Sequence, residues 1–576
     1  MDENTLYYGD NLDILQRYIK DDSIDLVYLD PPFKSDQSYN ILYKEQNGAR
    51  AASQIRAFED TWTWNQEGEE TYAELITKGG KVADCVQAFR KFLGPCDMLA
   101  YLVMMTPRLV ELRRVMKPTA SIYFHCDPVA SHYLKMLMDA VFGPEHFRNE
   151  IIWRRTGSHN KLLRYGPIHD VILFYTRTGN FTWNYPKRPY MKGHVEENFV
   201  KDDSGYKTAY YGNVLTGAGL RGGESGKTWR GIDPSAKNRH WALPGALLDD
   251  IDEDMSGLSQ HQKLDRLFEL GFIKIDPGQA WPMYERRLKK DDGQLLSDIW
   301  AFQPYTNGTV FGTEEGIDED ARWLSTRDRE RLGYQTQKPE GLLGRIIKAS
   351  SNKDDIVLDP FCGCGTTIAA SQKLQRKWIG IDITHLAITL MKTRLKDAFG
   401  DQAKYQVIGE PVSVPDAAAL AESDPYQFQY WALGLVGARP VERKKGADKG
   451  IDGKIIFQGE KPGEFETVII SVKGGNLKAT DIRDLRGVVE REKAAIGALI
   501  SMDEPTKPMQ TEAVTAGFYE HRAWGTKHPK LQLLTVAEIL AVKAIDMPPV
   551  RQLGATFKKA EKFKKPKKEQ MVLKGT

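Results

Sequence analysis

The sequence is poor in cysteine and in long apolar runs. It has five cysteines in 576 residues, too few for a disulfide scaffold, and this scarcity fits a reducing compartment. No apolar run reaches the ~18 residues that a membrane span needs. The opening residues MDEN have neither the basic nor the apolar region of a secretory signal. We therefore expect a cytoplasmic protein without a membrane segment.

The composition is that of a globular protein with several domains. Hydrophobic residues make up 41% and charged residues 27% of the chain, and at roughly 150 residues per domain the length predicts three or four domains. The net charge is only +2, yet residues 551–576 alone carry nine Lys or Arg and two Glu. This basic tail is either a solvated terminus or a loose contact for phosphates.

Pattern and composition divide the chain into successive regions. Short apolar strands alternate with helical stretches early in the chain and again before residue 410, whereas the region between them has weak periodicity and seven of the twelve tryptophans. A further α/β pattern and the basic tail follow a short linker. The predicted regions are 1–150, 151–335, 336–410, the linker 411–424, 425–545 and the tail 546–576.

A glycine-containing turn joins a predicted strand to a predicted helix in the third region. The strand 355–359 ends in Asp359 and runs into the loop PFCGCG, which contains Gly363 and Gly365. Such a turn lets a ligand approach the backbone and the start of the helix. The next strand, 377–382, ends in Asp382, about 20 residues on, where an acid can bind ribose hydroxyls. Taken alone, this pattern is as typical of a purely structural turn as of a ligand-binding turn.

A second motif follows the predicted strand 23–29. Asp30-Pro31-Pro32-Phe33 places a carboxylate beside two prolines, which lack N–H donors, and an aromatic ring. The result is a pocket of hydrogen-bond acceptors, suited to an amino group with two hydrogens, with Phe33 available for stacking. A rigid turn is the alternative for this motif alone, but the two motifs together favour a catalytic site.

The two motifs in this order resemble the amino-group DNA methyltransferases of the adenine-N6 type, in the permuted arrangement called the beta class. The resemblance covers roughly residues 1–400. It implies a Rossmann-like α/β methyltransferase sheet, an inserted target-recognition domain over 151–335, and S-adenosylmethionine as methyl donor. It assigns catalysis to the D-P-P-F motif and base stacking to Tyr39. It assigns the cofactor to Lys338, Pro339, Asp359, Phe361, Gly363, Gly365, Thr366 and Asp382, where the family more often has Glu at the last position.

The resemblance also implies the reaction. A target adenine in double-stranded DNA is flipped out, and its N6 nitrogen donates its hydrogens to Asp30 and the Pro31 carbonyl while it attacks the methyl group. Methylation of cytosine N4 or of RNA stays open, as does a DNA-binding regulator in which both catalytic folds are relics. Enzymes of this class often form homodimers.

The middle region contains residue types that read DNA. Lys227-Thr228-Trp229-Arg230 and Asn238-Arg239-His240-Trp241 combine side chains that contact base edges with aromatic rings. For any single tryptophan a place in a core is the better expectation, whereas the region as a whole is expected to contact DNA.

No metal site is expected in the methyltransferase region. Cys362 and Cys364 have no second pair of ligands, which argues against structural zinc. The run His125-Cys126-Asp127 lies at one strand end without further ligands, so a structural role is expected there.

The region 425–545 carries a different set of charged residues. Asp452 precedes one predicted strand, and Lys473 ends another, two residues after Ser471. This pattern resembles the Mrr-like branch of the PD-(D/E)xK restriction nucleases, in which a second acid is expected at the position of Ser471. The resemblance implies Mg²⁺ held by Asp452 and water activation by Lys473. If the next helix supplies the missing acid, Glu492 lies on its inward stripe. A degenerate domain that only binds DNA is the alternative to a bifunctional restriction and modification enzyme.

Overall fold

A nine-stranded mixed sheet organises most of the first unit of the chain. The computed structural model describes residues 3–32, 64–157, 163–201, 207–211, 215–243, 245–248, 251, 253–278, 280–288, 292–325, 328–334, 336–441, 450–461, 464–475, 477–548 and 560–563. The chain divides into two compact units, of which the second comprises Tyr185–Leu296 and Gln303–Glu319. Among the described residues, no helix has the length and apolar character to cross a membrane.

The sheet is parallel over its central part. Its spatial order is β14, β4, β5, β3, β2, β15, β16, β1 and β17. The strands are β1 (Asn4–Tyr8), β2 (Ile24–Leu29), β3 (Met116–Cys126), β4 (Phe147–Arg154), β5 (His169–Thr176), β14 (Ile299–Trp300), β15 (Ile356–Asp359), β16 (Lys377–Asp382) and β17 (Tyr405–Ile408). Strand β5 pairs antiparallel with both β3 and β4, so β4 runs in the same direction as β3 and β2.

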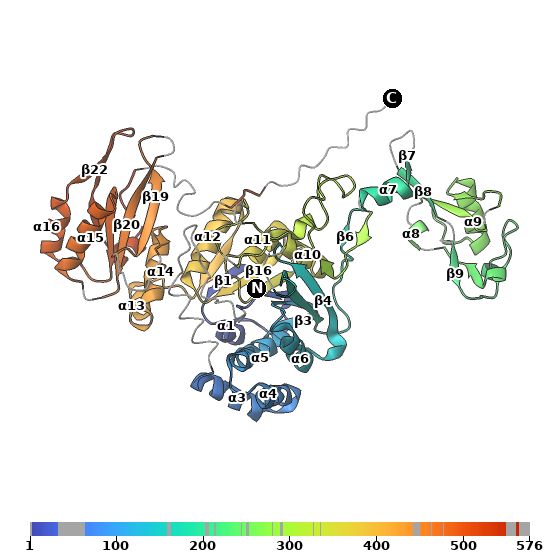
Figure 1. The fold of residues 1–576 in the computed structure, drawn as a ribbon, viewed down its shortest axis with the longest axis horizontal. Helices are drawn as coiled ribbons and strands as arrows, with labels where there is room; N and C mark the ends of the chain where they lie inside the picture. Colours follow the sequence, from blue (N-terminus) through green and yellow to red (C-terminus); the bar gives the residue numbers. More distant parts are fainter. Residues whose placement is uncertain are drawn as a thin grey trace. The chain divides into compact units, whose positions relative to one another are not determined.

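Helices cover both faces of this sheet (Figure 1). On one face lie α1 (Asn11–Tyr18), α5 (Asp97–Val115) and α6 (Ser131–Phe142), and on the other α10 (Glu340–Ser350), α11 (Thr366–Lys373) and α12 (His385–Phe399). In β2 the side chains alternate between the two cores, since Val27 and Leu29 join the first and Leu26 and Tyr28 the second. This doubly covered parallel sheet is the Rossmann-like fold that the sequence predicts.

The region 151–335 contributes to both units. Strands β4 and β5 and the short β14 belong to the large sheet of the first unit, because their apolar side chains complete its core. The second unit has a sheet of β11 (Ile273–Lys274), β12 (Met283–Arg287), β8 (Lys207–Tyr211) and β7 (Val200–Lys201), with α9 (Gln260–Glu269). It is therefore an insertion between strands of the large sheet.

The C-terminal region forms a second α/β layer within the first unit. Its sheet has the order β18 (Arg439–Pro440), β19 (Gly453–Gln458), β20 (Phe465–Lys473), β21 (Ile496–Ser501) and β24 (Leu531–Thr535). Helix α14 (Pro425–Leu435) lies on one face and α15 (Ala479–Arg491) on the other, with Ile470 and Ile469 pointing into the two respective cores. The segment 411–424, expected as a linker, contains helix α13 (Val414–Ser423).

Candidate functional site

Three carboxylates meet at one edge of the large sheet. Strands β2, β15 and β16 are adjacent and parallel, and each ends at an acid of the predicted site. Asp30 follows β2, Asp359 ends β15 and Asp382 ends β16. The carboxyl ends of parallel strands are where α/β sheets bind ligands. The structure thus brings together the two motifs, which are more than 300 residues apart in the chain.

Lys338 pairs with the acid of the D-P-P-F motif. Its Nζ atom lies 2.6 Å from Oδ2 of Asp30, and the two side chains are 11% and 15% exposed. The resemblance assigned Lys338 to the cofactor, and in the structure its ammonium group contacts the Asp30 carboxylate. Pro31 is buried directly after Asp30, and Phe33 and Tyr39 lie outside the described residues.

The loop after β15 needs its glycines. Gly363 and Gly365 have φ angles of +49° and +74°, which lie in the left-handed region that favours glycine. A Cβ atom on Gly363 would lie 3.1 Å from the ring of Tyr334, and one on Gly365 would lie 2.5 Å from Met391. The loop therefore has a fixed shape that side chains at these two positions would not allow.

The Asp382 carboxylate is held in one orientation. Oδ2 of Asp382 accepts a hydrogen bond from the Gly363 N–H at 2.9 Å, and Oδ1 accepts from both the N–H and the hydroxyl of Thr384. A carboxylate has about four lone-pair positions, so Asp382 can still accept from a ligand. Its neighbour Ile383 is 39% exposed and offers an apolar surface beside it.

Burial raises the pKa of two of the three carboxyl groups. It raises the pKa of Asp382 to about 6, against hydrogen bonds from Thr384 and Gly363 that lower it. Burial likewise raises the pKa of Asp359 to about 7, and the nearby charges of Asp30 and Asp382 raise it further. Both carboxyl groups therefore change charge near neutral pH, as groups in ligand-binding clefts commonly do.

Several residues that support the loop were not predicted from the sequence. The side-chain amide of Asn11 donates a hydrogen bond to the Pro360 carbonyl at 2.8 Å. Arg108 donates to the side-chain oxygen Oδ1 of Asn11 and to the Asp10 carboxylate. Tyr334 covers Gly363, and Gln337 fixes the chain around it through hydrogen bonds to Leu332 and Glu330. The sequence gives little indication of these roles, because each residue acts through contacts with distant parts of the chain.

The other predicted cofactor residues have clear places. Pro339 is the N-cap of α10, and Phe361 packs partly buried against the core of the sheet. The Thr366 hydroxyl accepts a hydrogen bond from Arg394 at 3.0 Å and is buried. Thr366 thus starts α11 and contacts protein in this structure, while the loop before it faces the site.

The run His125-Cys126-Asp127 has the structural role expected of it. The His125 ring lies between the Tyr28 hydroxyl, 2.9 Å from Nδ1, and Asp170, 3.1 Å from Nε2. Asp127 accepts from the Ala130 N–H, and Cys126 is buried in the core. Within the described residues, no cluster of three or more His, Cys, Asp or Glu side chains is suited to a metal ion.

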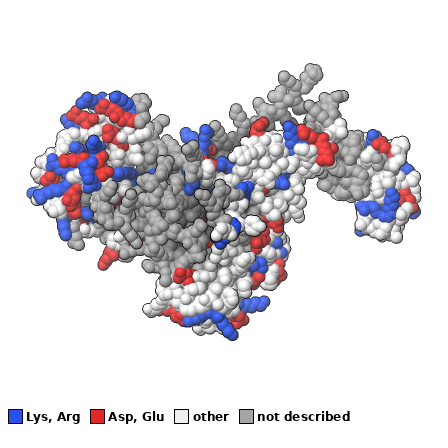
Figure 2. Space-filling view, viewed as in Figure 1, with Lys and Arg blue, Asp and Glu red and all other residues white. Residues whose placement is uncertain are grey.

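In the second unit, the two predicted tryptophans are core residues. Trp229 and Trp241 are 4% and 1% exposed and contact each other edge to face, while Lys227, Arg230 and Lys237 lie exposed around them. Figure 2 shows basic side chains gathered on this unit. The core expectation for single tryptophans is confirmed. Lys227, Thr228, Arg230 and Asn238 are exposed, whereas Arg239 is half-buried and His240 is buried.

In the C-terminal domain, the predicted nuclease residues are near one another but are used within the fold. Asp452 is buried, and its Oδ2 accepts from the Val472 N–H at 2.7 Å and from the Ser471 hydroxyl at 3.3 Å. Lys473 pairs with Asp481, in the first turn of α15, at 3.2 Å. The carboxylate and the lysine therefore each have a protein partner.

Glu492 lies at the opposite end of α15 from the turn that contacts Lys473. Glu492 lies just beyond the end of α15 and pairs with Lys454 and Arg491. Asp481 and Glu492 are eleven residues apart in sequence, a separation of about 16 Å along a helix. The acid that the next helix presents to Lys473 is Asp481.

Comparisons with known families agree with this division of the chain. A family model described as "DNA methylase", which covers N6 and N4 enzymes, matches residues 24–393. A second model, described as "NACHT-associated inactive Restriction Endonuclease 1", matches residues 426–541. The two matches fall on the large sheet with its insertion and on the C-terminal domain, respectively.

Similar proteins include restriction-modification methyltransferases. The Type II methyltransferase M.EcaI of Enterobacter cloacae is 26% identical over 392 residues, covering 68% of this chain and 69% of that protein. The Type III StyLTI Mod subunit of Salmonella typhimurium is 26% identical over 71% of this chain, which spans about half (55%) of that relative. Among solved structures, a putative DNA modification methylase from Thermus thermophilus complexed with S-adenosylmethionine gives a TM-score of 0.32 at 13% identity, over 71% of this chain and 99% of that one. The cytosine-N4-specific PvuII methyltransferase gives 0.29 at 12%, over 68% and 85%.

Proposed function

This chain belongs to the N6 and N4 DNA methylase family, whose model spans residues 24–393, and we propose that it transfers a methyl group from S-adenosylmethionine to adenine N6 in double-stranded DNA. The observation that carries the choice of an amino-group acceptor is Asp30, which stands at the catalytic edge of the sheet with two prolines after it. An aspartate rather than a serine at this position favours adenine over cytosine N4.

The described residues fit the proposed cofactor. The glycine loop presents bare backbone at a helix start, Asp382 is oriented by Gly363 and Thr384, and Ile383 exposes an apolar side chain next to it. A nucleoside offers ribose hydroxyls to such a carboxylate and a flat ring to such a side chain. When bound, S-adenosylmethionine supplies an electrophilic methyl group.

The acceptor side of the reaction falls to Asp30 and Pro31. The adenine amino nitrogen is a poor nucleophile because its lone pair is delocalised into the ring. Lys338 occupies Oδ2 of Asp30, so we assign Oδ1 and the Pro31 carbonyl to the two amino hydrogens. These hydrogen bonds stabilise the positive charge that develops on nitrogen during the attack.

Transfer of labelled methyl groups tests the substrate class. Purified protein with methyl-labelled S-adenosylmethionine is expected to label unmethylated duplex DNA and to leave RNA of the same sequence unlabelled. Labelling of RNA alone would overturn the proposed DNA substrate, and labelling of neither would overturn the proposed methyltransferase activity.

The pKa of Asp382, raised to about 6, predicts a pH-dependent cofactor affinity. Protonation removes the negative charge that strengthens a hydrogen bond from a ribose hydroxyl, so the Kd for S-adenosylmethionine should be constant above pH 7 and rise by about 10-fold at pH 5. Titration calorimetry across this range measures the profile. Asp382→Asn should bind more weakly with a flat profile, and an unchanged acid limb in that variant would contradict the assignment.

For the C-terminal domain, we propose a restriction-nuclease fold that does not cleave DNA. This rests on the use of Asp452 and Lys473 in contacts within the fold, with Ser471 where an acid is needed. On the face shown in Figure 2, its basic and acidic side chains are intermingled.

Unmethylated plasmid with Mg²⁺ should stay supercoiled, with or without cofactor. Cleavage that disappears in Lys473→Ala would contradict this proposal and indicate a bifunctional enzyme.

A further inference from the structure

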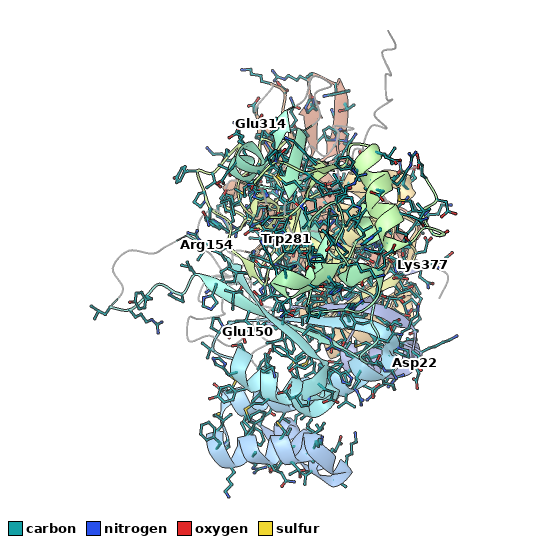
Figure 3. The ribbon with its side chains drawn as sticks, turned by 90° about the vertical axis from the view of Figure 1, so that its right-hand side faces the viewer. Asp22, Glu150, Arg154, Trp281, Glu314 and Lys377 are labelled. Atoms are coloured by element: carbon teal, nitrogen blue, oxygen red, sulfur yellow. The ribbon has the colours of Figure 1, made fainter. Side chains whose placement is uncertain are left out.

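A hairpin leaves the large sheet at the same edge as the catalytic acid. Strands β4 and β5 pair from Phe147 to Arg154, with Arg154 opposite His169. Because β4 runs parallel to β3 and β2, the turn between Arg154 and His169 emerges at the edge where Asp30 lies. Figure 3 labels Glu150 and Arg154 along strand β4.

Polar contacts link the base of this hairpin to the strand before Asp30, through the half-exposed Arg155 and the buried Asp170 and His125. Arg155 Nε lies 3.2 Å from Oδ1 of Asp170, whose Oδ2 lies 3.1 Å from His125 Nε2. The other nitrogen of His125 lies 2.9 Å from the hydroxyl of Tyr28, two residues before Asp30. The side chains of His125 and Asp170 are 0% and 4% exposed, so these contacts fix the hairpin base to the catalytic strand.

The described part of the hairpin tip exposes large apolar side chains. Leu163 and Tyr165 are fully exposed, and Arg164 between them is exposed as well. Tyr165 lies only four residues before His169, so the chain keeps it within about 14 Å of the end of the sheet. Apolar side chains next to an arginine, on a fixed base at a catalytic edge, are suited to contact with a nucleic acid.

We propose that Leu163 and Tyr165 form a wedge that enters the DNA duplex beside the target base and fills the space left when that base flips out. Arg164 then lies against the phosphate backbone. Flipping costs the unstacking and unpairing of the target nucleotide, and apolar side chains inserted between base steps offset such a cost. The proposal rests on the proposed function, because only a base within a duplex needs to be flipped.

The proposal predicts that loss of these side chains lowers methylation mainly when the target adenine is base-paired. In Leu163→Ala/Tyr165→Ala, kcat/KM on a duplex with a paired target adenine should fall by about 10- to 100-fold. On a duplex in which the same adenine faces an abasic site, the defect should shrink to about threefold or less, because that base is already unpaired. The target sequence is first mapped by sequencing DNA methylated by the wild type.

A matched control is available on the same unit. Phe92 on α4 (Gly80–Leu93) is 76% exposed, and Phe92→Ala should leave both duplexes unaffected. Unchanged melting temperatures establish that the variants fold, as expected for exposed side chains. Equal loss on paired and abasic duplexes, or no loss on either, would overturn the wedge while leaving the methyltransferase proposal intact. Absence of methylation by the wild type on any DNA would instead overturn the proposed function.

Discussion

Replacing Asp30 with asparagine is expected to lower kcat by about 100- to 1,000-fold while the Kd for S-adenosylmethionine changes by less than about threefold. The amide turns one acceptor into an NH₂ donor that faces the amino group of the substrate. It also removes the negative charge that stabilises the developing cation. Single-turnover methylation together with cofactor titration separates the two quantities.

Asp25 provides a matched control for this substitution. It lies on the same strand β2, its side chain is 12% exposed, and it pairs with Lys117 at 2.8 Å, much as Asp30 pairs with Lys338. Asp25→Asn therefore removes a comparable ion pair away from the catalytic edge. Comparable losses of kcat in the two variants would show that Asp30 acts through the stability of the strand rather than through chemistry.

Replacing Asp382 with alanine is expected to raise the Kd for S-adenosylmethionine by about 100-fold, since hydrogen bonds to a charged group contribute about 1.5–3 kcal/mol each. The change also releases the Gly363 N–H and Thr384, which Asp382 holds. At saturating cofactor, kcat should stay within a few-fold of the wild type. Equilibrium binding and steady-state kinetics measure the two effects.

Asp382→Glu is the conservative counterpart, because it keeps the charge and moves it by one methylene group. It should recover most of the affinity that alanine loses. A variant Asp382→Ala with unchanged Kd and strongly reduced kcat would contradict a role in cofactor binding and would point to the chemical step.

The catalytic edge could be predicted because its acids follow short buried strands. Parallel strands place their carboxyl ends together, so the positions of Asp30, Asp359 and Asp382 after such strands indicate that the three acids meet. The pairing of Lys338 with Asp30 could not be predicted, since it joins residues 308 positions apart and depends on where the insertion returns the chain to the sheet. The cover that Tyr334 gives to Gly363 has the same origin.

Helix α15 shows a different limit on what a sequence pattern can predict. Periodicity predicted that Ile482, Leu485, Val488 and Val489 face the core, and all four are buried. The same periodicity placed Glu492 on that face, but a period gives the angle around a helix and not the end at which a ligand lies. Lys473 meets the first turn of α15, so its partner is Asp481.

The identity of the methylated nucleoside tests the central claim most directly. Duplex DNA incubated with the protein and S-adenosylmethionine is digested to nucleosides and analysed by mass spectrometry. The account predicts N6-methyldeoxyadenosine from the wild type and from Asp25→Asn, and nearly none from Asp30→Asn. N4-methyldeoxycytidine as the product, or undiminished N6-methyldeoxyadenosine from Asp30→Asn, would contradict it.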